Sequence, residues 1–382
     1  GSLEDAKVRP GHLLFITLAE KGAVVVQGDH QTHLPAHQVN IKDPTGAGEA
    51  FCGAAIAYLL QGKHPVMAGR KAILVAAKKV EGVGPSALLQ DEAPPGMPLD
   101  ERIQINDPQV RKISAIVKKL SEADPFNFVG EHLPPENHPA ALDYFFAATF
   151  QQFGFWETSN GRYSYPLIAP INGKRLKGSS YLYTAYLRLL DEDPEFYSPE
   201  RQANLKREEL LKIFRTDDGT DPMPAFDLHL TQAQKYGQDM LALGMTPRDI
   251  LKEVNASSSP LNTLTLMLDH ISGYKEDPIR KKSNLLALCL SQRPEKFLAF
   301  GSGESVKPVV DYHAQRACLR TGLVNVVDPE LRGKLANRQL VSADEEWAVR
   351  FAGYRVQQAV VELSGKGLGA VDWFFFNYIR SH

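Results

Sequence analysis

The hydrophobic pattern changes about ninety residues into the chain. The first part contains short runs of β-branched residues, and a turn signal at Glu20-Lys21-Gly22 separates two of them. Such runs predict buried strands, and small apolar residues after a glycine turn predict a packed helix. We expect strands over 13–17, 23–27 and 39–41, and helices over about 49–61 and 66–82. This order of strand, glycine turn and helix is typical of an α/β unit.

Most of the remaining chain has apolar residues at helical spacing. Between the two parts, residues 90–99 form a proline-rich break, which favours a linker. Helices are expected around 110–120, 182–190 and 261–271, and a short hairpin around 162–177. We therefore predict a small α/β unit at 1–90, a linker at 91–100 and a mainly α region at 101–382.

The composition narrows the possible functions. The chain has 382 residues, with 43 Lys and Arg against 45 Asp and Glu and a formal net charge of -2. This balance disfavours direct binding of nucleic acid but allows a small phosphorylated ligand. Cys52, Cys289 and Cys318 are too few and too scattered for disulfides or a zinc site, and neither a secretory signal nor a membrane-spanning stretch is found. We expect a cytoplasmic protein that uses no metal or other cofactor and does not bind membranes.

A glycine turn at 43–49 predicts an anion site. Backbone N–H groups at a helix start can hold an anion, and a nearby carboxylate can deprotonate an attacking hydroxyl. The run Asp43-Pro44-Thr45-Gly46-Ala47-Gly48-Glu49 resembles the signature D-T-x-G-A-G-D of ribokinase-like (PfkB) carbohydrate kinases, and the resemblance covers residues 7–88. It implies a carboxyl-terminal fragment of such a kinase, with an anion hole at Gly46, Ala47, Gly48 and Glu49. Glu49 replaces the catalytic aspartate of the family.

Four features of the second region could carry chemistry. The run 150–156 places two glutamines among aromatic residues, which fits either a buried segment or a wall that stacks a base. Asp311 precedes a predicted helix, so it can cap that helix or face a pocket. Lys281 and Lys282 also begin a predicted helix, and they either lie in solvent or bind a phosphate. Asp372 lies among aromatic residues. There a carboxylate must be paired or hydrogen-bonded, or its pKa is raised.

In their order and spacing, these segments resemble the queuosine salvage protein family from about Arg102 to Arg380. Gln152-Phe153-Gly154-Phe155-Trp156 is similar to N-F-x-F-W, and Lys281-Lys282-Ser283-Asn284 to K-R-A-Q. Asp311-Tyr312-His313 is similar to A-D-Y-R, with His in place of Arg, and AVDWFFFNYIR to a terminal D-Y-Y-L-W segment. Asp227-Leu228-His229 stands where the family has E-E-R.

The resemblance implies a helical fold similar to helix-hairpin-helix DNA glycosylases. It also implies hydrolysis of the N-glycosidic bond of queuosine 5′-monophosphate to queuine and ribose 5-phosphate. In such a cleavage a carboxylate stabilises an oxocarbenium-like sugar and activates water, a role matched by Asp311. The implied substrate contacts are stacking by Phe153 and Trp156, the polar edge of the base at Gln152 and Asp372, the phosphate at Lys281 or Lys282, and further contacts at His132, Asp227 and His313.

Two other functions stay open from the residues alone. A nucleoside or sugar kinase would act through residues 46–49 and would depend on ATP and Mg²⁺. A non-catalytic nucleic-acid-binding module would share the glycosylase-like fold, although the net charge of -2 counts against it. Asp311 and His313 are two residues apart and do not share a helix face, so they do not indicate a metal site. The sequence leaves open the preferred modified base, the need for the 5′-phosphate and the oligomeric state.

Overall fold

A computed structural model describes residues 8–9, 11–37, 39–60, 65–81, 99–120 and 126–377. Most of the predicted linker at 91–100 and the last five residues of the chain lie outside these ranges. The chain divides into two compact units, Gly1–Pro95 (unit 1) and Gly96–His382 (unit 2). About 52% of the residues that the structure describes are helical and the sheets are small, which confirms a mainly α protein preceded by a small α/β fragment.

Unit 1 is a three-stranded antiparallel sheet with two helices. The strands, in the order β1-β2-β3, are β1 (Leu13–Thr17), β2 (Ala23–Gln27) and β3 (His30–Leu34), and the helices are α1 (Ala47–Leu60) and α2 (Pro65–Val80). The central strand β2 reads AVVVQ, and its first four residues are buried. Gly69 lets α2 approach the sheet closely, since a Cβ atom there would lie 2.6 Å from the Leu34 side chain.

The first two strands and both helices of unit 1 lie within two residues of their predicted ranges. The predicted third strand is wrong, because residues 39–41 are not in a strand. Instead, the two-residue turn Gly28-Asp29 folds β3 back onto β2, with Gln27 opposite His30. Gly28 has a φ of +60°, the left-handed conformation that such tight hairpin turns require. The segment HQTHL is mostly polar, so its hydrophobic pattern did not indicate a strand.

Unit 2 has two hydrophobic cores. The larger core takes its residues from 128–309 and Leu368, and the smaller one from 103–117 and 317–375. The elements that surround the larger core are α4 (Ala141–Thr149), β5 (Trp156–Ser159), β6 (Arg162–Pro166), β7 (Ile168–Ile171), β8 (Lys174–Lys177), α5 (Gly178–Leu187), the 3₁₀ helix η4 (Pro194–Tyr197), α6 (Pro199–Ala203), α7 (Arg207–Phe214), α8 (Phe226–Leu243), α9 (Pro247–Ala256), α10 (Pro260–Leu268) and α11 (Lys281–Gln292).

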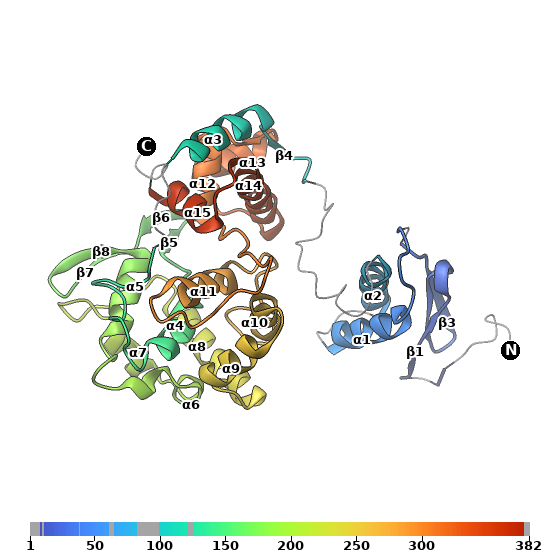
Figure 1. Cartoon of the computed structure of the whole chain (residues 1–382), viewed down its shortest axis with the longest axis horizontal. Helices are drawn as coiled ribbons and strands as arrows, with labels where there is room; N and C mark the ends of the chain where they lie inside the picture. The colour runs from blue at the N-terminus through green and yellow to red at the C-terminus, as the bar shows by residue number, and fades with distance from the viewer. Residues whose placement is uncertain are drawn as a thin grey trace. The chain divides into compact units, whose positions relative to one another are not determined.

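The smaller core is enclosed by both ends of unit 2. Its elements are β4 (Ile103–Ile105), α3 (Asp107–Lys119), α12 (Tyr312–Arg320), β9 (Val324–Val326), α13 (Pro329–Ala336), α14 (Ala343–Ser364) and α15 (Leu368–Asn377). Strand β4 pairs antiparallel with β9, which joins the first strand of the unit to its last quarter. Figure 1 shows the helices of the smaller core together at the top of unit 2 and α4–α11 below them. The chain therefore starts in the smaller core, builds the larger one and returns.

Local sequence explains the main helices. Helix α4 reads ALDYFFAAT, and every residue except Asp143 is buried, so it forms the centre of the larger core. Helix α14 begins with a capping box, in which Ser342 accepts from the backbone N–H of Glu345 and the Glu345 side chain returns to Ser342. It ends at Gly365, whose φ of +68° is typical of a helix terminus.

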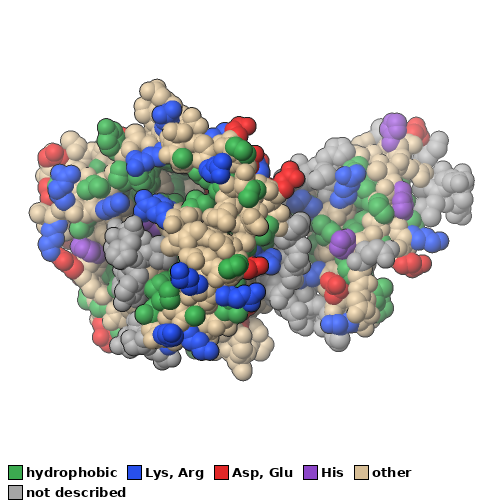
Figure 2. Space-filling model, turned by 90° about the horizontal axis from the view of Figure 1, so that it is seen from above, with side chains coloured by type: hydrophobic (Ala, Val, Ile, Leu, Met, Phe, Trp, Pro, Cys, Tyr) green, Lys and Arg blue, Asp and Glu red, His purple; other side chains and the backbone are tan. Residues whose placement is uncertain are grey.

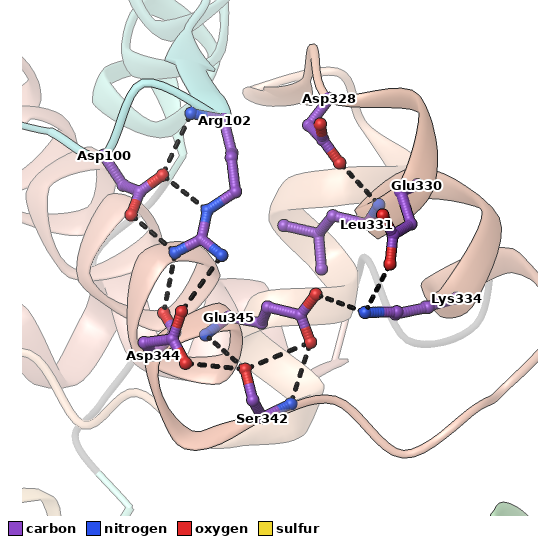
Figure 3. Close-up of polar contacts among 9 residues, drawn as sticks. All are labelled: Asp100, Arg102, Asp328, Glu330, Leu331, Lys334, Ser342, Asp344 and Glu345. Carbon is purple, nitrogen blue, oxygen red and sulfur yellow. Dashed lines mark hydrogen bonds and ion pairs between the residues drawn. The ribbon is translucent and has the colours of Figure 1, made fainter.

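A polar network connects β4, α13 and α14 (Figure 3). The Arg102 guanidinium binds Asp100 at 2.7 Å and Asp344 at 3.1 Å. The Lys334 ammonium binds Glu330 at 3.0 Å and Glu345 at 2.7 Å. These pairs hold the first strand of unit 2 and helix α13 against the start of α14.

The hairpin expected at 162–177 is in fact two hairpins. Strand β6 pairs with β5, and β7 pairs with β8. Asn160 and Gly161, both with positive φ, form the β5–β6 turn, a pairing that favours a tight hairpin. This hairpin also contacts the segment after α13, because Tyr163 N donates to the Arg338 carbonyl at 2.9 Å and Leu340 N to the Gly161 carbonyl at 2.8 Å. None of the helices in the described part of the chain has the length and apolar content needed to cross a bilayer.

Candidate active site

A cavity of about 1780 Å³ opens in unit 2, lined by residues from both of its cores. Eight of the ten residues predicted for a glycosidase site line it: His132, Gln152, Phe153, Trp156, Lys281, Asp311, His313 and Asp372. They come from segments up to 240 positions apart in the sequence, so the fold itself assembles this group. Asp227 and Lys282 do not line the cavity.

Asp311 both caps a helix and lines the cavity. Its Oδ1 accepts from the backbone N–H of His313 at 2.8 Å and of Ala314 at 3.0 Å, which makes it the N-cap of α12. The two roles weighed from the sequence are therefore compatible. Both hydrogen bonds go to one oxygen, and Oδ2 accepts none from the residues that the structure describes. The helix cap thus fixes a carboxylate whose second oxygen is available to a ligand.

Lys281 lies at the start of α11, half-buried at the cavity wall. Its Nζ donates to the Gln152 carbonyl at 3.3 Å. Burial lowers the pKa of Lys281, while the charges of Asp311, Asp277 and Asp372 act in the opposite direction. An anion bound beside this ammonium would compensate for its lost hydration.

Asp277 and Arg350 connect the two sides of the site. Asp277 Oδ2 accepts from the Lys281 backbone N–H at 2.8 Å and from the Arg350 guanidinium at 2.5 Å. Arg350, on α14, also donates through Nε to the Val310 carbonyl at 3.2 Å. One arginine of the smaller core therefore holds both the residue before Asp311 and the helix start that carries Lys281.

Asp372, on α15, is the second carboxyl group in the cavity. Burial and the nearby charge of Asp311 together raise the pKa of Asp372 to about 7, while the charge of Lys281 acts in the opposite direction. Around neutral pH the Asp372 carboxyl is therefore partly protonated. A carboxyl group that titrates near neutral pH can exchange a proton with a bound substrate.

Gln152 lines the cavity, and its side chain contains an unsatisfied donor. The residue is buried, and its amide nitrogen Nε2 has no hydrogen-bond partner among the described residues. Buried amide groups are normally satisfied, so a free one at a cavity wall indicates a ligand or water contact. The amide is therefore suited to the polar edge of a base.

The Phe153 ring already contacts two neighbours. It stacks on the His229 imidazole, with centroids 4.3 Å apart and planes at 17°, and the Lys282 ammonium lies 4.4 Å from its centroid. Burial lowers the pKa of His229 to about 3, and burial together with Lys281 lowers the pKa of Lys282 to about 8. Since these contacts cover the ring, Phe153 offers less stacking surface to a ligand than the sequence suggested. Lys282 supports the wall from behind rather than reaching into the cavity.

The aromatic surface of the cavity is centred on Trp156. The rings of Tyr163 and Tyr312 each meet it edge-on, with centroids 6.3 Å away. The Arg338 guanidinium lies 6.0 Å from the Trp156 centroid. Trp156 and its neighbours form an apolar wall next to Asp311, because Tyr312 directly follows that residue.

The two predicted histidines are held by defined partners. His132 Nδ1 lies 2.9 Å from the Thr184 hydroxyl, which itself donates to the Ser180 carbonyl, so His132 is the donor in this pair. His313 Nδ1 accepts from the Arg316 guanidinium at 2.9 Å.

The other predicted residues lie elsewhere. Asp227 is exposed at the surface and forms an ion pair with Arg207, so we remove it from the predicted site. The kinase-like residues Gly46, Ala47, Gly48 and Glu49 belong to unit 1, around the start of α1. There the Lys79 ammonium lies 3.5 Å from the Asp43 carboxylate.

Sequence reasoning missed several residues that shape the site. Arg293 is completely buried and donates to the carbonyls of Phe128, Pro134 and Pro135, which holds the loop that carries His132. Arg350 and His229 were also missed. An arginine or a histidine in an amphipathic helix has an ordinary pattern, so no local signal marks it.

Two family models match the chain, one within each unit. The model for the pfkB carbohydrate kinase family matches residues 4–92. Deoxyribokinases from Salmonella typhi and Salmonella typhimurium are each 41% identical over 71 residues, 19% of this chain. The chain spans 23% of the length of these relatives, so unit 1 is similar to a fragment of a kinase.

Unit 2, with its helical fold and its cavity between two cores, defines the class of the protein. The model described as queuosine salvage protein matches residues 132–364, more than half of the chain. The chain belongs to the queuosine salvage protein family, here joined to a pfkB-like fragment. Its role is therefore in the salvage of queuosine.

Proposed function

We propose that the chain hydrolyses the N-glycosidic bond of queuosine 5′-monophosphate and releases queuine and ribose 5-phosphate. The observation that supports this most is the convergence, in one cavity, of a fixed carboxylate, a second carboxyl group, a half-buried lysine and an aromatic wall. These groups match the parts of the reaction: a developing cation at the sugar, a leaving base and a phosphate.

In the proposed reaction the bond between the sugar C1′ and the base nitrogen breaks. The base leaves with the bonding pair and takes up a proton, while water adds its oxygen to C1′ and loses a proton. The Oδ2 atom of Asp311 would stabilise the positive charge on the sugar and accept the proton of the water. Because the cap bonds of α12 hold Oδ1, the carboxylate need not reorganise during the reaction.

The remaining groups would bind the substrate. The deazapurine would lie against Trp156, with Gln152 and the partly protonated Asp372 at its polar edge. Lys281 would hold the 5′-phosphate, whose charge would offset the cost of burying the ammonium. His132 offers one further polar group at the wall.

The test is incubation of the full chain with queuosine 5′-monophosphate, with free queuine followed by mass spectrometry. Asp311→Asn is the sharpest variant, because asparagine also caps helices well but carries no charge. We expect Asp311→Asn to keep the unfolding free energy within about 0.5 kcal/mol and to lose at least a thousandfold in kcat. Asp311→Ala should lose as much activity and in addition about 1 kcal/mol of stability.

Two outcomes contradict the proposal. No release of queuine at micromolar enzyme would exclude the activity. Turnover by Asp311→Asn at the wild-type rate would remove Asp311 from the reaction while leaving its capping role intact.

A further inference from the structure

Part of the cavity is not used by the proposed substrate. A volume of about 1780 Å³ exceeds the roughly 300–1,000 Å³ of ordinary small-molecule sites. The additional wall is formed by the end of α12, by β9, by α13 and by the segment after α13. It belongs to the smaller core and includes Trp156's neighbour Arg338, whereas Lys281 is on α11 of the larger core.

This additional wall is basic. Arg320, Arg332 and Arg338 line it, and none of the three forms an ion pair with any residue that the structure describes. Other arginines of the chain do form ion pairs. Arg102 and Arg280, for example, each bind an aspartate at 2.5–2.7 Å. In the view of Figure 2, Lys and Arg side chains lie both over the middle and along the edges of unit 2, whereas Asp and Glu side chains lie mostly near its edge.

The acidic residues nearby are already engaged. On α13, Glu330 binds Lys334, which also binds Glu345 (Figure 3). Glu346, which lines the cavity, accepts from Gln315 and lies 3.9 Å from Arg350. Arg332 is two residues from both Glu330 and Lys334, so it projects from a different side of the helix. The arginine wall therefore keeps its positive charge.

We propose that Arg320, Arg332 and Arg338 form a second phosphate site, so that the substrate is a nucleotide with phosphates on both sides of its ribose. This inference rests on the proposed function. With the 5′-phosphate at Lys281, the second phosphate is attached through the 3′-oxygen and extends past Trp156 toward the arginines. It is either a 3′-monophosphate or the phosphodiester that joins a following nucleotide.

The test is equilibrium binding by calorimetry to full-length Asp311→Asn, which should bind without turnover. The ligands are queuosine 5′-monophosphate, queuosine 3′,5′-bisphosphate and a dinucleotide with a 5′-phosphorylated queuosine followed by uridine. We expect the second phosphate to tighten binding at least tenfold. An equal gain for the last two ligands indicates a phosphodiester site, and a gain for the bisphosphate alone indicates a terminal 3′-phosphate.

The variant that tests the arginines is Arg320→Gln with Arg332→Gln. Combined with Asp311→Asn, it should abolish the gain in affinity from the second phosphate and leave the affinity for the 5′-monophosphate within twofold. With Asp311 present, it should leave the rate of hydrolysis of the 5′-monophosphate within twofold. Arg355→Gln is the matched control, since Arg355 is exposed on α14 and does not line the cavity. If Asp311→Asn with its arginines intact binds the 5′-monophosphate and the 3′,5′-bisphosphate equally tightly, the inference is overturned. The same holds if it does not bind the bisphosphate at millimolar concentration. Absence of queuine release from the 5′-monophosphate would instead contradict the proposed function, and the comparison of affinities would still decide on the arginine wall.

Discussion

Asp311 and Asp372 face one cavity, yet their surroundings differ. Asp311 accepts hydrogen bonds from two backbone N–H groups at a helix start, whereas burial and the charge of Asp311 raise the pKa of the half-buried Asp372 to about 7. A carboxyl group that titrates near neutral pH can donate a proton to a leaving base only below its pKa. The state of Asp372 should therefore control the pH dependence of the proposed reaction.

We expect kcat/KM for queuosine 5′-monophosphate to fall about tenfold per pH unit above pH 7, as Asp372 loses its proton. Asp372→Asn should react more slowly and show no such decline between pH 7 and 8. Since the pKa of Lys282 is about 8, Lys282→Gln is the control and should keep the decline. A profile that is the same in the wild type and Asp372→Asn would assign the titration to another group.

His229 is a second titratable residue inside the protein, with its Nδ1 2.7 Å from the Gln151 side-chain oxygen. Its pKa is lowered from 6.5 to about 3 by burial and by Lys282, so the folded protein keeps it neutral. Between pH 6.5 and 3 the unfolded chain binds a proton that the folded chain does not. The free energy of unfolding must therefore decrease as the pH falls through this window.

From this residue alone we expect a loss of about 2 kcal/mol between pH 7 and pH 5. Urea unfolding at both pH values would measure it. His229→Gln, which keeps a polar partner for Gln151, should be less stable at pH 7 but should lose less stability on acidification. The same pH dependence in the variant and the wild type would show that His229 is not the group that makes the fold acid-sensitive.

At the residue scale, the sequence predicted those cavity-lining residues that stand beside a recognisable local pattern. Asp311 follows an apolar run and precedes a predicted helix, and Gln152 lies in an aromatic run, so both could be found without a structure. His229 and Arg350 lie within helices of ordinary composition, and they reach the site only through packing between distant segments. Asp227 illustrates the opposite error, because its motif resembled the family while its side chain lies at the surface.

Helices α11, α12 and α14 must keep a fixed arrangement for Lys281 and Asp311 to act together. Arg350 provides this connection, since it binds Asp277 before α11 and the Val310 carbonyl before α12. The Arg350 and Asp277 side chains are 17% and 14% exposed, so the pair is largely shielded from water. Removal of one partner from such a pair leaves an uncompensated charge.

We expect Arg350→Met to lower the unfolding free energy by about 3 kcal/mol and kcat by at least tenfold. Arg350→Lys keeps the charge but lacks the planar guanidinium that reaches both acceptors. Its kcat should therefore lie between those of the wild type and Arg350→Met. Arg355→Met on the same helix is the control and should change neither quantity. A loss of stability without a change in kcat would show that the pair is structural only.

At the element scale, helix positions were predictable because apolar residues recur at helical spacing in α3, α5 and α10. The positions of the strands were less predictable. Strand β3 is polar and depends on the Gly28-Asp29 turn, and the single hairpin expected at 162–177 is two hairpins because Asn160-Gly161 starts an earlier turn. Pairing between β4 and β9 spans more than two hundred residues, a distance over which no local pattern gives information.

For the whole molecule, the question is whether catalysis needs both units. Each hydrophobic core is built within one unit: residues 13–76 form the core of unit 1, and both cores of unit 2 lie beyond residue 98. The cavity is lined by residues between Gln104 and Phe375. Unit 2 therefore contains every described group to which the proposed reaction assigns a role.

A chain that begins at Gly96 should consequently fold and hydrolyse queuosine 5′-monophosphate with a kcat/KM within twofold of the full chain. A second truncation that begins at Asn106 is the matched control. It removes β4, whose Ile103 is buried in the smaller core and whose strand pairs with β9, and it also removes Arg102, which binds Asp344. This shorter chain should unfold at a markedly lower temperature in calorimetry, because it loses core contacts that the first truncation keeps. A chain from Gly96 could instead fold as stably as the full protein but lose more than tenfold in kcat/KM. That result would show that the pfkB-like unit contributes to the reaction, and the predicted anion site at the start of α1 would be the first part of that unit to test.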